Sequence, residues 1–468
     1  MHPRVTLAVL SVAGLAYAVL SSSVVPALPT IQHDLHASET SVTWLLTGYL
    51  LSASVGTAII GRLGDMYGKE HVLLWTLILL AGGTLLAALS HTLPLLIAAR
   101  VVQGVAGGIY PLAFGIIRDE FPRERVAGGI GFISAILGIG AGAGIVSGAA
   151  VVEHLSWNWL FWMPLAVIVV AAFCTWRFVP ESPVRVPSRI NWLAAALMSV
   201  GMCAVLVAIS ETIAWGWGSA KTIGLLLAGL AVCGAWVAVE VRSREPLIDM
   251  AMMRIRGVWT ANLTAFLLGA GMYSAFIVFP QFAQLPKSTG FGFGASPVAA
   301  GLYLVPSTVA MMLVGLAAGT ISVRFGSKAA VVVGSLFSVA AFALISGAHG
   351  HPYDMLVSSA LMGVGIGLAF AALGNLVVRA VSAHQTGAAG GMNTVMRTIG
   401  GALGAQIAAT LIADHTGTDR LPAVTGFTET FVMATAFLAV CTLAALLIPA
   451  GRTRAAEALE PALALDSD

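Results

Sequence analysis

Two arginines stand inside long apolar segments of the chain, where a charged side chain needs a partner or water. Arg100 is followed one helical turn later by Gln103, and Arg397 shares a helical face with Asn393. Burying an arginine in a membrane costs about 3 kcal/mol or more. We expect Arg397 either to line a hydrated substrate cavity with Gln103 and Asn393 or to brace a backbone carbonyl. A cavity that holds both arginines would favour neutral or anionic molecules.

A second group of charges and glycines lies where apolar segments end. Glycine lets the backbone turn sharply and lets helices pack closely. Asp65 could cap the N-terminus of a neighbouring helix, or it could pair with Lys69 or Arg118. A cluster of opposite charges here could latch two parts of the molecule together, and a solvated charged loop of about eight residues is the alternative. The candidate gating residues are Gly61, Asp65, Gly68, Lys69, Arg118 and Asp119.

Aromatic side chains in the apolar segments could stack on a drug-like molecule. We assign Tyr49 and Tyr273 to the candidate cavity, and Trp44, Tyr110 and Tyr303 could act in the same way. Aromatic belts at the membrane surface and ordinary helix packing are the alternative interpretation.

The composition places these residues in a membrane protein. Of 468 residues, 58% are hydrophobic and only 9% are charged, whereas soluble proteins carry roughly 25% charged residues. The net charge of +2 is too small to suggest a nucleic-acid partner, and we expect none. The four cysteines lack metal-ligand spacing, and no segment resembles a phosphate-binding loop, so we predict no metal, no cofactor and no use of ATP.

Apolar segments of about 20 residues are long enough to cross a membrane as helices. The sequence predicts an all-α polytopic protein with fourteen transmembrane helices. We place them at 6–30, 42–62, 71–90, 94–118, 126–151, 158–178, 190–211, 220–241, 258–284, 297–322, 328–348, 353–379, 387–413 and 427–449.

The distribution of positive charge supports this number of helices. With the N-terminus in the cytoplasm, 18 of the 23 Lys and Arg residues fall on the cytoplasmic side and three on the outer side. Such a bias is typical of membrane proteins, and a missed helix would destroy it. We therefore expect both termini in the cytoplasm.

The chain also resembles itself. Residues 61–69 recur loosely at 319–327, an offset of 258 residues that spans eight helices. Many transporters contain such repeats and hold the substrate between them. We predict a six-helix bundle at 1–180, two inserted linker helices at 181–257, a second six-helix bundle at 258–452 and a disordered cytoplasmic tail at 453–468.

Residues 61–69 resemble the signature cytoplasmic motif of the major facilitator superfamily, and residues 96–104 resemble its fourth-helix motif. In that motif an intramembrane arginine, here Arg100, is implicated in proton coupling. Three glycines that share one helical face are similar to the glycine-rich fifth-helix motif of antiporters, and we expect them to pack helices closely. They are Gly140, Gly144 and Gly148. The motif usually has a proline after its glycine, but here Ile145 follows Gly144.

Further landmarks resemble the fourteen-helix drug:proton antiporters, in the same order along nearly the whole chain. They are residues 27–31 with Trp44 and Tyr49, then 157–161, 215–217, 240–247 and 391–404. The resemblance implies a secondary transporter in the bacterial inner membrane that expels drugs, dyes or antibiotics in exchange for protons, by alternating access. Its partners would be the lipid bilayer, protons and a small-molecule substrate, and we expect a monomer.

The sequence lacks an obvious proton carrier for such an antiporter. Many relatives carry an acid in the first helix, where this chain has Leu20 followed by three serines. A buried carboxylate is the usual carrier because burial raises its pKa toward neutrality. Glu211 and Asp65 are the candidates, and solvation of a helix end is the alternative role for each. The other functions considered are import or export of a specific metabolite, which could be anionic, and, more remotely, a polytopic membrane enzyme.

Overall fold

The computed structural model describes residues 3–181, 191–416 and 421–449. Fourteen of its helical segments are long and apolar enough to cross a membrane, which confirms the predicted number and order of spans. The predicted tail at 453–468 lies outside the described residues.

Three of the spans are made of more than one helix. The first combines α1 and α2, the fourth combines α5, a 3-10 turn and α6, and the tenth combines α14 and α15. The longer helices are α1 (Pro3–Ser22), α3 (Glu39–Tyr67), α4 (Lys69–Ala88), α5 (Leu93–Gly104), α6 (Ile109–Glu120), α7 (Arg123–His154), α8 (Trp159–Phe178), α9 (Trp192–Ser210), α11 (Ala220–Arg242), α13 (Arg256–Gln284), α15 (Val305–Phe325), α16 (Ser327–Gly347), α17 (Pro352–Ala380), α18 (Thr386–Asp414) and α19 (Val424–Leu446). The shorter helices are α2 (Leu28–Asp34), α10 (Thr212–Trp215), α12 (Met250–Arg254) and α14 (Pro297–Leu302), and the 3-10 turns are η1 (Val25–Ala27), η2 (Val105–Gly108), η3 (Lys287–Thr289) and η4 (Ala383–Gln385).

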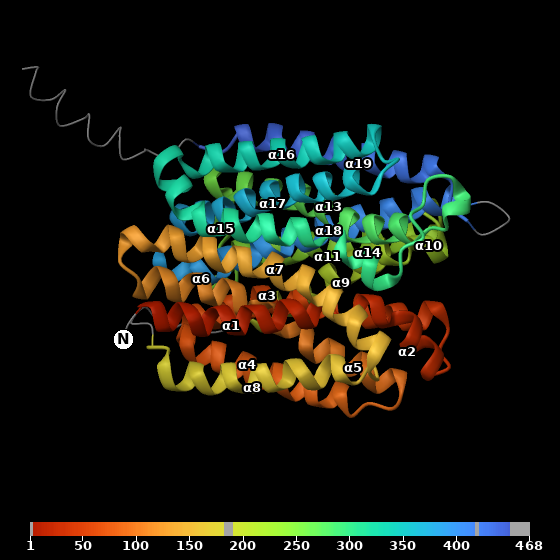
Figure 1. Cartoon of the computed structure of the whole chain (residues 1–468). Helices are drawn as coiled ribbons and strands as arrows, with labels where there is room; N and C mark the ends of the chain where they lie inside the picture. Colours follow the sequence, from red (N-terminus) through yellow and green to blue (C-terminus); the bar gives the residue numbers. More distant parts are fainter. Residues whose placement is uncertain (1–2, 182–190, 417–420, 450–468) are drawn as a thin grey trace, which may run out of the picture.

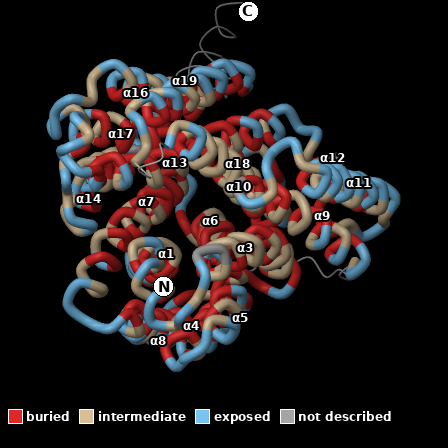
Figure 2. The backbone as a smooth tube through the Cα atoms, turned by 90° about the vertical axis from the view of Figure 1, so that its right-hand side faces the viewer, coloured by how far each residue is buried: buried red, intermediate tan, exposed pale blue. Residues whose placement is uncertain are grey.

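The helices lie side by side in two groups (Figure 1). Helices α1 to α8 enclose one core of buried apolar side chains, and α13 to α19 enclose most of another, which also includes side chains of α9, α11 and α12. We call these groups the first and second bundles. In both views α7 lies where the two bundles meet (Figures 1 and 2). The bundles contact each other mainly through α7 with α15 and through α3 with α18.

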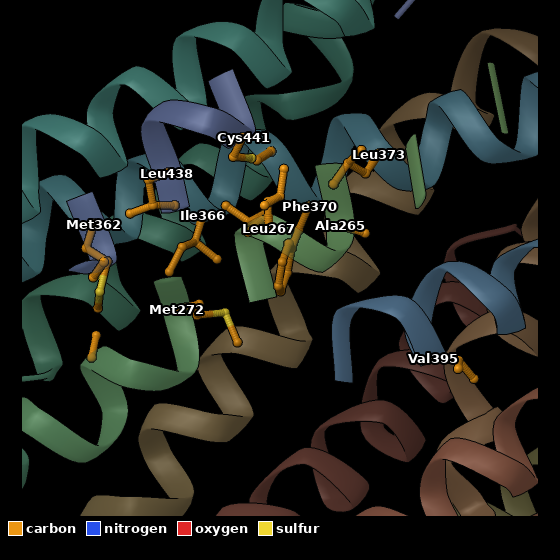
Figure 3. Packing of buried hydrophobic residues seen from close by; sticks show 14 of the residues in the cluster. Ala265, Leu267, Met272, Met362, Ile366, Phe370, Leu373, Val395, Leu438 and Cys441 are labelled. Carbon is orange, nitrogen blue, oxygen red and sulfur yellow. The ribbon is translucent and has the colours of Figure 1, made fainter. Parts of the chain in front are cut away.

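The second bundle has a densely packed core of apolar side chains (Figure 3). Met272 of α13, Ile366 and Phe370 of α17, and Leu438 of α19 belong to it, and all four are buried. Without water in the bilayer, close packing of this kind is a main source of helix association. It fixes α17 and α18, which carry much of the site described below.

Helices α9 and α11 lie to one side of the two bundles (Figure 2). Helix α9 packs against α11 and also touches α3 and α18, one helix from each bundle. Near the two ends of α18, Gln385 donates to Asp249 over 3.0 Å and Trp217 donates to the Thr410 hydroxyl over 3.0 Å. The segment between the bundles therefore holds α18 near both of its ends.

The connection between α3 and α4 differs from the predicted loop of about eight residues. It consists of Gly68 alone, whose φ of 101° suits glycine. Residues such as Asp65 that we assigned to the loop are helical instead, because their charges have partners in the folded protein. Gly326, with φ of 85°, joins α15 to α16 in the same way. The two one-residue turns occupy matching places in the sequence repeat.

Candidate functional site

Asp65 connects the two bundles at the end of α3. Its carboxylate is fully buried and accepts hydrogen bonds from the backbone amides of Gly387, over 3.2 Å, and Ala388, over 3.1 Å. These amides belong to the first turn of α18, where unpaired N–H groups and the helix dipole favour a negative charge. Asp65 of the first bundle thus caps a helix of the second.

Asp65 can approach α18 because glycines face each other at this point. A Cβ atom on Gly61 would meet the Gly387 carbonyl, and a Cβ atom on Gly387 would meet the Gly61 carbonyl. The two backbones are therefore in contact, with no room for a side chain between them.

Lys69 is a buried cation held between two acids. Its Nζ lies 2.7 Å from Asp119 and 3.7 Å from Asp65, and all three side chains are almost fully inaccessible. A buried charge is tolerated when it is paired in this way. Lys69 therefore holds Asp119 of α6 and Asp65 of α3 in place within the first bundle.

Arg118 makes a second connection between the bundles. Its guanidinium donates to the Thr386 hydroxyl over 2.6 Å and to the carbonyls of Val381, over 2.8 Å, and Ser382, over 3.1 Å. The two carbonyls follow the C-terminus of α17, where a positive charge is favourable. We call Asp65, Lys69, Arg118 and Asp119, together with the Gly61–Gly387 contact, the inter-bundle latch.

Asn375 adds a connection that the sequence analysis missed. Its side-chain amide is buried in α17 and donates to the Ala127 carbonyl of α7 over 3.2 Å. A lone asparagine in an apolar helix is the available sequence signal, but it does not identify the partner helix.

Arg100 is buried inside the first bundle rather than in a cavity between the bundles. Its guanidinium donates to the carbonyls of Leu45, over 3.2 Å, and Leu20, over 3.3 Å, and to the Gln103 side chain over 2.9 Å. It also lies over the Tyr49 ring at 4.1 Å from the centroid. Arg100 therefore ties α5 to α1 and α3.

Replacing Arg100 with Lys tests this structural role. Lysine keeps the charge but has one nitrogen in place of a planar fork, so it cannot reproduce the bonds that two guanidinium nitrogens make to Leu20, Leu45 and Gln103. We expect a loss of about 3 kcal/mol or more in the free energy of unfolding, because buried acceptors lose their partner. Thermal unfolding of the purified variant should show a lower Tm. An unchanged Tm would contradict the role, and Lys221→Gln at an exposed position is the control.

Arg397 is placed differently from Arg100. It lines a small cavity between the bundles, with its guanidinium 4.6 Å from the centroid of the Phe370 ring. The cavity has about 20 Å³ of free volume, which is room for about one water molecule. Helices α6, α7, α17 and α18 contribute its lining, which is Tyr110, Phe114, Ser134, Leu137, Phe370, Gly374, Val377, Val378, Gly390, Asn393, Thr394 and Arg397.

Of the other candidate cavity residues, one lines this cavity and three do not. Asn393 lines the cavity, and its amide nitrogen donates to Ala261 and Asn262 of α13. Gln103 and Tyr49 instead belong to the buried surroundings of Arg100, and Gln103 also donates to Thr84 over 3.2 Å. The half-buried Tyr273 packs edge-on against Phe276, and it is not among the cavity-lining residues.

Glu211 and the three glycines of α7 lie away from this cavity. Glu211 stands at the junction of α9 and α10 and is half-buried. A Cβ atom on Gly140, Gly144 or Gly148 would meet atoms of α1 or of the Ser23 backbone. These glycines therefore pack α7 against α1. Among the described residues, no group of three His, Cys, Asp or Glu side chains is placed to hold a metal ion.

Comparisons with known proteins agree on one family. The model of the Major Facilitator Superfamily matches residues 10–405 and, in a second match, 261–463. The "Tetracenomycin C resistance and export protein" of Streptomyces glaucescens is 30% identical, and the match covers 89% of this chain and 77% of that protein. "Multidrug resistance protein 3" of Bacillus subtilis is 26% identical over 86% of this chain and 78% of that protein.

Solved structures show the same fold at low sequence identity. The human organic anion transporter MFSD10 superposes with a TM-score of 0.68 at 17% identity and covers 95% of this chain and 100% of its own. The proton:xylose symporter XylE superposes with a TM-score of 0.67 at 13% identity and covers 96% of both chains.

Proposed function

The chain belongs to the major facilitator superfamily, and from this premise we propose that it exports drug-like or antibiotic molecules by alternating access coupled to protons. The family makes it a multi-pass membrane transporter rather than an enzyme. Relatives named for drug and antibiotic resistance support export as the direction of transport.

The inter-bundle latch is the observation that carries the proposal. Asp65 and Arg118 both reach from the first bundle to the second, and both bind backbone groups at the ends of α17 and α18. These bonds close one end of the path between the bundles, next to the cavity lined by Arg397 and Asn393. Breaking them would let the bundles rock apart at that end, as alternating access requires.

We place this closed end in the cytoplasm of a bacterial cell, with the protein in the inner membrane and both termini inside. The excess of Lys and Arg on this side supports that orientation. The protein would act as a monomer of two six-helix bundles, with α9 and α11 as an inserted pair. Its partners would be the small-molecule substrate and protons.

The coupling proton needs a carrier, and no carboxylate is among the cavity-lining residues. Glu211 and Arg100 remain our candidates for coupling. Glu211 would carry the proton itself. Arg100 would influence a carrier only indirectly, since its guanidinium is bound to the first bundle.

Accumulation of a fluorescent substrate in bacteria that lack their own pumps tests the proposal. Expression should lower accumulation several-fold, and a protonophore should abolish the effect. Glu211→Gln should uncouple export from the pH gradient, while Glu153→Gln serves as an acidic control at another helix end. Higher accumulation on expression would indicate uptake instead, and export that survives the protonophore would contradict proton antiport.

A further inference from the structure

We propose that Arg397 is the recognition residue for an aromatic anion, a planar molecule that carries a carboxylate or phenolate group. This inference rests on the proposed export function and names the substrate class of the same cavity.

The charge of the cavity lining is the first observation. Arg397 is the one charged side chain among the lining residues, which include neither Asp nor Glu. A positive charge without a nearby acid attracts an anion and repels a cation, and the effect is strong in an apolar interior.

The hydrogen bonds of the two intramembrane arginines are the second observation. Arg100 is fully inaccessible and donates to two carbonyls and to Gln103. Arg397 is half-buried, and no described residue accepts a hydrogen bond from its guanidinium or forms an ion pair with it. Its five N–H donors are therefore available to a ligand, and a guanidinium can hold a carboxylate with two parallel hydrogen bonds.

The position of this guanidinium is fixed by its neighbours. Its central carbon lies 4.6 Å from the Phe370 ring centroid, and Phe370 is itself held in the packed core of the second bundle (Figure 3). A cation over an aromatic face is stabilised without losing its hydrogen-bond donors. Arg397 is thus oriented before a ligand arrives, which reduces the entropy cost of binding.

The remaining lining indicates why the anion would be aromatic. Tyr110 and Phe114 of α6 also line the cavity, and they offer rings for stacking. The amide nitrogen of Asn393 is already bonded to α13, so its oxygen is left to accept a hydrogen bond from a substrate hydroxyl. With the latch closed the cavity is too small for such a molecule, so binding requires the bundles to separate.

Matched pairs of aromatic probes test the inference. The pairs are fluorescein with rhodamine 123, whose carboxyl group is a methyl ester, and 1-naphthoate with 1-naphthylmethylammonium, each an anion and a cation of similar shape. Efflux is measured from pump-deficient cells that express the full chain. We expect faster export of the anion of each pair, and a loss of about tenfold or more for the anion in Arg397→Gln, with no loss for the cation.

Two further variants keep the result interpretable. Arg397→Lys retains the charge without the fork, so it should keep part of the export of the anion. Lys221→Gln removes an exposed positive charge and should change the export rate of neither probe. Each purified variant is checked for monodispersity and for its Tm.

The outcomes separate this inference from the function on which it rests. Export of cations alone, or an equal loss of both probes in Arg397→Gln, would overturn the role of Arg397 while leaving the exporter in place. No export of any probe would contradict the proposed function, and the inference with it.

Discussion

Replacing Asp65 with Asn should lower the export rate by about tenfold or more while the protein stays folded. The Asp65 carboxylate accepts two backbone N–H groups from the first turn of α18. Asparagine has the same shape, but its amide nitrogen is a donor that would face a second donor, and its negative charge is gone. Hydrogen bonds to a charged group contribute about 1.5–3 kcal/mol, equivalent to a shift of roughly 10- to 150-fold between closed and open states.

The shift should also be visible as a change in structure. Spin labels at Arg125 and Arg379 are both exposed and stand on different bundles near the latch. In a background with the four native cysteines replaced by Ala, Asp65→Asn should increase the population of long distances between the labels. Glu124→Gln removes an exposed acid at the same end of the molecule, and it should leave the population of long distances unchanged. Distances and export rates equal to those of the parent protein would contradict the role of the latch.

The sequence was sufficient for the number and order of the helices, because lipid demands long apolar segments and charge bias marks their ends. It also drew attention to Asp65, Lys69, Arg118 and Asp119, since opposite charges at a helix end have few favourable partners, and their role in gating stays a prediction. It could not predict that Asp65 would bind amides 322 and 323 residues away along the chain. Those amides belong to a glycine-rich helix start with no charge to mark it.

The connection between α3 and α4 shows how unpredicted contacts between distant residues affect local structure. We placed its charges in a connection of about eight residues, because the apolar segments on either side end before them. Burial of Lys69 between Asp65 and Asp119 lets the helices extend until a single glycine remains. The two arginines show the same limit, because apolar context alone does not distinguish Arg100, bound to carbonyls of α1 and α3, from Arg397 in the cavity.

Replacing Gly61 with Ala should have an effect on transport as large as the loss of the Asp65 charge, through sterics alone. The added methyl group would meet the Gly387 carbonyl, so the bundles could not close fully. Overpacking of this kind costs about 1–3 kcal/mol. Because the contact lies between the bundles, they can relieve it by separating, and we expect slow export, an open latch end and little change in Tm.

Other glycines of the first bundle supply the controls for Gly61→Ala. A Cβ atom on Gly82 of α4 would meet nothing within 4 Å, so Gly82→Ala should leave export unchanged. A Cβ atom on Gly64 would meet the Leu112 side chain within the first bundle. Gly64→Ala should therefore lower the Tm without opening the latch. A fall in Tm for Gly61→Ala, with no change in the distances between labels, would place its effect on folding instead.

The double variant Gly61→Ala with Asp65→Asn decides whether the two residues act through one contact. If the added methyl group already separates α3 from α18, the Asp65 carboxylate no longer reaches the amides of Gly387 and Ala388. Removing its charge should then destabilise the closed state little further. The free-energy changes of the two single variants should therefore sum to more than the change measured for the double variant. Additive effects on the open population would mean that Asp65 stabilises the closed state by a route that does not need the helices to touch.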